Sequence, residues 1–322
     1  MTAGLTRMLR GRLTVSYLIV IALIVILLAT GGLISDRFLS VRNFSNLAQQ
    51  MAVLGVVSLG QTVVILTGGI DLSNGTLISS ATVFFANFLE WRPELIWLAI
   101  VLALAGSTIV GAVNGLLVVG LRIHPLIVTL GMSSILYGAT LLYRKEPGGT
   151  VPDSIQNLAF GRIFGIPIPA LILIAVFSIA GLWLQRFRSG RAVYFVGGNP
   201  ESARLNGLSV GRVVVYVYAI SGLCAGLAAI LLAARTGVGD PRIGASMTLS
   251  SITPVVVGGT ILAGGRGGVF GTLLGVFLVS LLNNVLNYMN VSSYYQWIIQ
   301  GLIILTAVGL HTGLRRDGRH GA

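Results

Sequence analysis

The sequence predicts an all-α polytopic membrane protein with about ten transmembrane helices and both termini in the cytoplasm. Of its 322 residues, 55% are hydrophobic and only 9% are charged, whereas a soluble domain carries about 25% charged residues. Apolar runs of about 20 residues, the length that crosses a hydrocarbon core of about 30 Å, also recur along the whole chain.

The N-terminal residues 1–12 include Arg7, Arg10 and Arg12 and are expected to form a short cytoplasmic tail. The apolar run that follows, 15–34, is longer than the core of about 7–15 residues in a signal peptide, so we expect it to be the first span. Further spans are expected at roughly 46–67, 74–89, 95–121, 125–143, 168–184, 213–234, 249–263, 269–287 and 295–312.

The runs 74–89 and 249–263 are short for a membrane span, and we expect the Gly-rich segments beside them to dip into the membrane. Residues 13–314 are expected to form one membrane domain, followed by a cytoplasmic tail over 315–322.

The arginines and the single lysine set the orientation. With the N-terminus inside, thirteen of the 21 basic residues fall on the inner side and eight on the outer side, as the positive-inside rule favours. Two hydrophilic segments exceed turn length: 144–167 is expected outside, and 185–212, which holds five arginines, is expected inside.

Several kinds of chemistry are excluded. Lys145 is the only lysine, so the chain cannot contain the Gly-Lys-Ser/Thr of a P-loop. Cys224 is the only cysteine and the three histidines are far apart, so we expect no metal site and no cofactor. The net charge of +12 comes from arginines between apolar runs, which predicts no binding of nucleic acid.

A Gly-rich segment after the second span is similar in sequence to a segment later in the chain. Residues 68–77, GGIDLSNGTL, resemble residues 264–273, GGRGGVFGTL. Repeated breaks of this kind often lie near the pathway of a transporter. Since one copy carries Asp71 and the other Arg266, we consider an ion pair between them, directly or through water. The alternative is that Asp71 or Ser73 caps the third helix and that Arg266 is an ordinary positive-inside residue.

Other polar and small residues lie inside the expected spans. Asn283, Asn287 and Asn290 share one helix face, and Gln61 lies within the second span. Such amides bond to a neighbouring helix or line a wet pathway, and Gln61, Asp71, Asn283 and Asn287 are our candidates for the pathway. Glycines at four-residue spacing, at 111/115, 222/226 and 267/271/275, favour close helix packing over a dimer seam.

The inner segment contains a predicted short helix. Asn199 suits the N-cap, Pro200 the first helical position and Glu201 the first turn. Arg204 follows in the next turn, and Gly207 can end the helix. This helix either docks into a partner or is part of a solvated connection.

Taken together, five stretches resemble the permease subunits of bacterial ABC sugar importers of the ribose type. They are GQTVVILTGGIDLSNGT (60–76), HPLIVTLGMSSILYG (124–138), GGNPESARLNGLSVGRV (197–213), VVGGTILAGGRGGVFGTLLG (256–275) and NNVLNYMNVSSYYQWIIQGLIIL (283–305). One departure is Asn74, where the family more often has an apolar residue.

The resemblance implies a multi-pass inner-membrane protein that pairs with a second permease chain, as a homodimer. It also implies a cytoplasmic ATP-binding subunit, an extracytoplasmic solute-binding protein and a coupling helix around Asn199–Gly207. The alternatives are a permease for a branched-chain amino acid, a nucleoside or a signalling furanone, an ion-coupled secondary transporter, and a structural scaffold.

Overall fold

The computed structural model describes the backbone of residues 2–317 and the side chains of 17–303, 305 and 306. Its long helices are α1 (Thr2–Ile34), α2 (Val41–Leu66), α3 (Asn74–Trp91), α4 (Ile96–Gly120), α5 (Pro125–Tyr143), α7 (Ile168–Arg186), α10 (Val210–Thr236), α13 (Val269–Tyr288) and α14 (Ser293–Asp317). The short elements are α6 (Asp153–Phe160), β1 (Arg162–Ile163), β2 (Ile166–Pro167), α8 (Arg188–Gly198), α9 (Pro200–Leu205), α11 (Met247–Ser250) and α12 (Ile252–Val257).

The prediction of an all-α polytopic membrane protein is confirmed. In the described part of the chain, seven helices are long and apolar enough to cross a membrane, namely α1, α2, α4, α5, α7, α10 and α13. The predicted tail 1–12 is helical from Thr2 onward as part of α1. Of the predicted C-terminal tail, residues 318–322 lie outside the described residues.

The predicted span 249–263 is wrong as a continuous helix. The chain instead forms α11 and α12, which together are too short to cross a membrane. Glycines with positive φ at 259, 264, 265 and 267 follow directly, and a residue with a side chain would be strained in that conformation. The glycines therefore keep residues 258–268 out of a helix.

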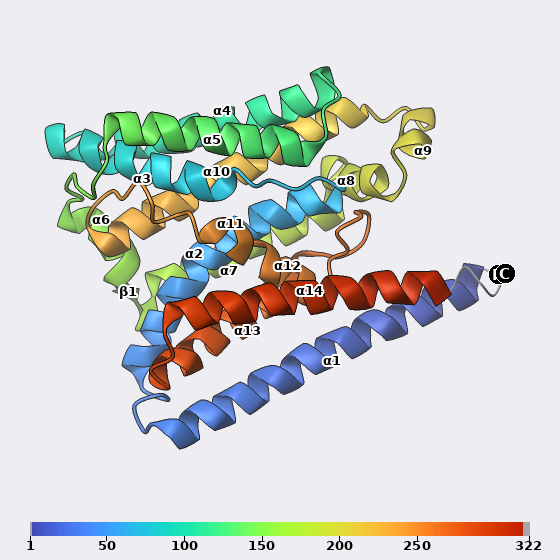
Figure 1. The fold of residues 1–322 in the computed structure, drawn as a ribbon, viewed down its shortest axis with the longest axis horizontal. Helices are drawn as coiled ribbons and strands as arrows, with labels where there is room; N and C mark the ends of the chain where they lie inside the picture. The colour runs from blue at the N-terminus through green and yellow to red at the C-terminus, as the bar shows by residue number, and fades with distance from the viewer. Residues whose placement is uncertain (1, 318–322) are drawn as a thin grey trace.

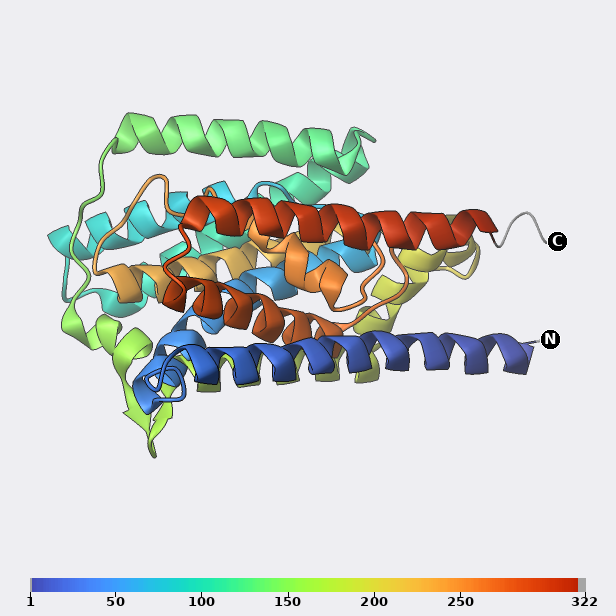
Figure 2. The ribbon, with the colours of Figure 1, turned by 60° about the horizontal axis from the view of Figure 1, so that its bottom comes forward.

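The helices run between two ends of the molecule (Figures 1 and 2). One end carries α8, α9, the start of α1 and the end of α14, and the opposite end carries α6 and the β1–β2 hairpin. The segments 144–167 and 185–212 thus lie at opposite ends, as predicted. That the α9 end is cytoplasmic stays a prediction from the charge distribution.

Helix α10 lies in the centre and packs against α4, α2 and α3. Glycines make the α4–α10 contact close: a Cβ on Gly111 would lie 2.2 Å from the Tyr218 carbonyl oxygen, and one on Gly222 would lie 2.1 Å from the Ser107 carbonyl oxygen. Gly271 and Gly275 likewise contact α12 and its C-cap. The glycines within helices therefore serve helix packing inside the chain, as predicted, whereas Gly267 of the predicted series lies in the loop before α13.

Candidate functional site

The segment after α2 turns back into the protein interior. Gly68 follows the helix with φ of 83°, and residues 67–73 lead to the start of α3 (Figure 1). The Asp71 carboxylate there accepts a hydrogen bond of 2.8 Å from Ser221 Oγ, and Ser221 lies near the middle of α10. Helix α3 therefore starts about halfway between the two ends of the molecule.

Asp71 is buried and bound by neutral donors. Its Oδ1 accepts hydrogen bonds from the backbone N–H of Ser73 (3.0 Å) and from Ser73 Oγ (2.7 Å). Asn114 Nδ2, on α4, donates to Ser73 Oγ at 2.8 Å. A buried carboxylate needs such donors in place of water, so this network fixes the break between α2 and α3 against α4 and α10.

Asp71 and Arg266 form no direct ion pair. The ion pairs among the described residues join Arg92 to Glu94, Arg144 to Glu90 and Arg204 to Glu201. The partners of Asp71 are hydroxyls and a backbone N–H instead, while Arg266 is exposed. The direct form of the hypothesis is therefore wrong for this conformation, because nearby hydroxyls satisfy the carboxylate. Contact through water stays a prediction.

The predicted cap of α3 also takes another form. Ser73 occupies the N-cap position, but its side chain makes no capping hydrogen bond. Asp71 instead accepts the N–H of the residue two positions on, which is an Asx-turn. The carboxylate thus shapes the turn that precedes the helix.

Gln61 lies beside the start of α3. Asn74 Nδ2 donates to Gln61 Oε1 at 3.1 Å and to Ser251 Oγ at 3.2 Å, so it connects α2, α3 and the N-cap of α12. Gln61 Nε2 and Asn74 Oδ1 have no hydrogen-bond partner among the described residues, and both side chains are fully buried. Asn74, where the family more often has an apolar residue, thus connects the start of α3 to α2 and to the start of α12.

A second break with the same local features, residues 237–246, follows α10, and the Gly-Gly pattern of the sequence did not predict it. Thr236 and Gly237 end α10 as Thr67 and Gly68 end α2, and both glycines have positive φ. Asp240 Oδ1 accepts the N–H of Arg242 at 2.8 Å, which repeats the Asx-turn of Asp71.

The two breaks meet inside the protein. A Cβ on Gly75 would lie 2.4 Å from the Gly244 carbonyl oxygen. The two breaks are also similar in sequence, since residues 67–80 read TGGIDLSNGTLISS and residues 236–251 read TGVGDPRIGASMTLSS. This similarity is the sequence signal that predicts the second break. The predicted copy at 264–273 is also adjacent, since a Cβ on Gly264 would lie 2.7 Å from the N of Gly68.

The amides late in α13 bond to neighbouring helices. Gln300 Nε2 donates to Asn283 Oδ1 (3.3 Å) and Gln296 Nε2 donates to Asn287 Oδ1 (2.7 Å), so both connect α13 to α14. Asn284, which is not on the predicted face, forms a buried reciprocal pair with Asn43 at 2.9 and 3.0 Å. In these contacts the amides of Asn283 and Asn287 bond to a neighbouring helix, which was one of the two alternatives predicted for this polar face.

Helix α9 has the predicted start and end. The Asn199 side chain accepts the N–H of Ser202 at 3.0 Å, and Pro200 is the first helical residue. Glu201 and Arg204 form an exposed ion pair at 3.6 Å, and Gly207 has φ of 78° just beyond the helix. The helix is exposed on most of its sides, with Leu205 82% accessible.

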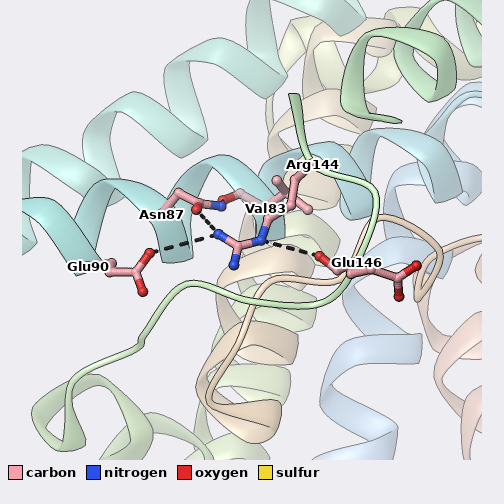
Figure 3. Close-up of polar contacts among 5 residues, drawn as sticks. All are labelled: Val83, Asn87, Glu90, Arg144 and Glu146. Carbon is pink, nitrogen blue, oxygen red and sulfur yellow. Dashed lines mark hydrogen bonds and ion pairs between the residues drawn. The ribbon is translucent and has the colours of Figure 1, made fainter. Parts of the chain in front are cut away.

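At the opposite end, Arg144 holds the start of the 144–167 segment to α3 (Figure 3). Its guanidinium donates to Asn87 Oδ1, lies 3.8 Å from the Glu90 carboxylate and donates to the Glu146 carbonyl at 3.3 Å. Gly148 forms a β-bridge with Gly239 of the second break. This end of the molecule is therefore closed by contacts between α3, residues 144–150 and the second break.

Comparison with known proteins gives consistent matches. The family described as "Branched-chain amino acid transport system / permease component" matches residues 43–308. The ribose import permease protein RbsC of Escherichia coli (strain K12) is 38% identical over 290 residues, covering 88% of this chain and 90% of that protein. The fructose import permease protein FrcC of Rhizobium meliloti is 33% identical over 92% of this chain and 85% of that protein.

A further relative, the D-allose transport system permease protein AlsC of Escherichia coli (strain K12), is 32% identical over 89% of each chain. No solved structure matches the chain significantly.

Proposed function

Because the chain belongs to this family of transport-system permease components, we propose that it is the membrane-spanning permease subunit of an ABC importer that carries a simple sugar. The observation that carries the proposal is its 38% identity to a ribose import permease over nearly the full length of both chains. Fructose and allose permeases match as well, which favours a monosaccharide over a branched-chain amino acid or a nucleoside. The apolar helices suit a multi-pass protein of the bacterial inner membrane.

The energy for transport comes from a separate cytoplasmic ATP-binding subunit. With Lys145 as its only lysine, the chain has no P-loop of its own. An extracytoplasmic solute-binding protein delivers the sugar to the end that carries α6 and the β1–β2 hairpin. Binding and hydrolysis of ATP on the partner shift the permease between its inward-open and outward-open populations.

Helix α9 is the proposed coupling helix, with Asn199, Pro200, Glu201, Arg204 and Gly207 as its functional residues. Its capped start and its terminal glycine define a rigid element six residues long. Its charged pair and Leu205 are exposed, so they are available to a partner.

A second copy of the chain covers the face between α5 and α14. Between these helices lies α11, about midway between the two ends (Figure 1), with Leu249 and the preceding Ala245 and Ser246 exposed. Irregular backbone at that depth is tolerated only against protein or water. We therefore place the homodimer contact and the translocation pathway on this face.

The four candidate pathway residues take supporting roles in this proposal. Asn283 and Asn287 hold α14 beside the pathway through their bonds to Gln300 and Gln296. Gln61 and Asp71 are buried and hold the broken segment that forms the wall of the pathway.

Reversal of the charges on α9 tests the coupling assignment. The double variant Glu201→Arg with Arg204→Glu places each charge against the helix dipole and presents the opposite pattern to the partner. We expect it to abolish uptake of sugar by the complete importer while the permease stays in the membrane. The double variant Glu201→Asp with Arg204→Lys, which keeps the sign of both charges, is the matched control. Normal uptake by the double variant would count against α9 as the coupling helix.

An ion-coupled transporter that works alone is the competing function. Reconstitution of the purified chain in liposomes, without ATP or partners, separates the two: we expect no accumulation of ribose in an imposed ion gradient. Accumulation under these conditions would refute the ABC assignment.

A further inference from the structure

A pocket of about 380 Å³ opens beside the proposed coupling helix. It is lined by Gly197, Gly198, Ala263, Gly264, Gly265 and Arg266. Gly198 is followed by Asn199, the N-cap of α9, so the pocket adjoins α9 along the chain. Three of the lining residues, Gly198, Ala263 and Arg266, are exposed.

The wall of the pocket joins three parts of the fold. The N–H of Gly265 donates to the carbonyl oxygen of Leu66, the last residue of α2, at 2.9 Å. A Cβ on Gly197 would lie 1.8 Å from the same oxygen, so α8 approaches α2 as closely as only a glycine permits. Tyr194 Oη donates to the Gly267 carbonyl at 3.4 Å. A displacement of α8 therefore acts directly on the end of α2 and on the loop that leads into α13.

The segment that supplies Gly197 and Gly198 to the pocket is basic. Residues 185–212 contain five arginines, all exposed, and their one carboxylate, Glu201, is paired with Arg204. In the described part of the chain, no carboxylate forms an ion pair with Arg266. Complementary charge on a partner steers association and fixes its register, so the chemistry of this surface fits an acidic one.

We propose that this pocket is a second docking site for the ATP-binding subunit, which inserts an acidic loop whose carboxylate binds Arg266. The inference rests on the proposed function and extends it. The partner then contacts both α9 and the junction of α8 with α2 and the 258–268 loop. Its motion reaches the break at residues 67–73 through Leu66 and the break at 258–268 through Gly265.

Crosslinking in the complete importer tests the contact. Ala263→Cys, at the pocket, is labelled with a maleimide–benzophenone reagent in membranes that contain all subunits. The native Cys224 is buried, and the parent chain is the control for background labelling. Ser202→Cys on α9 reports the proposed coupling contact, and Lys145→Cys at the opposite end is the negative control. We expect photoproducts with the ATP-binding subunit from positions 263 and 202 and none from 145.

The outcomes separate the inference from the proposed function. A product from position 202 but not from position 263 overturns the proposal of a second docking site and supports the assignment of α9 as the coupling helix. No product from either position counts against both. A product from 263 alone supports the pocket and contradicts the α9 assignment.

A change of charge tests the role of Arg266. We expect Arg266→Glu to lower the amount of ATP-binding subunit that co-purifies by roughly tenfold or more, whereas Arg266→Lys keeps most of it. Equal recovery with the two variants would overturn the carboxylate contact. Thermal melting of each variant alone confirms that both are folded.

Discussion

Gly111→Ala tests whether the close approach of α4 and α10 positions the buried network at Asp71. The added Cβ would lie 2.2 Å from the Tyr218 carbonyl oxygen and 3.0 Å from the Gly222 nitrogen. Real contacts of a Cβ are almost never shorter than 3.0 Å, so the two helices must separate by about 0.8 Å. Asn114 lies on α4 and Ser221 on α10, and both bind the Asp71–Ser73 pair.

The expected change in the free energy of unfolding follows from two opposing effects of the added methyl group. Overpacking in a well-packed interior costs about 1–3 kcal/mol. Alanine also gains roughly 0.5–1 kcal/mol over glycine inside a helix. Gly106→Ala removes the second effect from the comparison, since it lies on the same helix and its Cβ would meet no atom within 4 Å. We expect Gly111→Ala to be less stable than Gly106→Ala by about 1–3 kcal/mol.

The assay is the free energy of unfolding in mixed micelles, measured by titration with a denaturing detergent and followed by circular dichroism. Both variants are measured beside the parent chain, and uptake is measured in the complete importer. We expect Gly106→Ala to match or exceed the parent in stability and Gly111→Ala to lose both stability and uptake. Equal stability of the two variants would refute the claim that the glycine contact positions the helices.

Two other sites give predictions of the same kind. Asp71→Ala leaves its buried serine donors without an acceptor, which costs about 1–3 kcal/mol for each group. We therefore expect it to melt at a much lower temperature than Asp71→Asn, which keeps an acceptor oxygen. The same melting temperature for both variants would contradict the hydrogen-bonding role of Asp71. Arg144→Gln removes a donor from the buried Asn87, and we expect faster hydrogen exchange over residues 144–152, whereas Lys145→Gln, at an exposed neighbour, should leave exchange unchanged. Unaltered exchange in Arg144→Gln would show that Arg144 does not hold this segment.

The breaks in the helices could be predicted only in part. A Gly-rich sequence beside a short apolar run indicated the breaks before α3 and before α13, and glycines do end the helices there. The apolar pattern did not predict the break at 237–246, because α10 has the pattern of an ordinary span and the apolar run 249–263 indicates another span directly after it. The signal that predicts this break is Thr-Gly followed by Asp, which residues 236–240 share with residues 67–71. The Gly-Gly pair alone does not detect it.

Local sequence patterns were sufficient to predict the membrane class, most of the spans and the whole of α9. These depend on the length of apolar runs and on the capping chemistry of a few consecutive residues, such as Asn199 with Ser202. The partners of the buried polar groups, by contrast, depend on how the helices pack in three dimensions. Ser221 is 150 positions from Asp71, and Asn284 is 241 positions from Asn43. Local patterns carry no information on which helices approach across such separations, and in a largely apolar interior the nearest hydroxyl or amide satisfies each polar group.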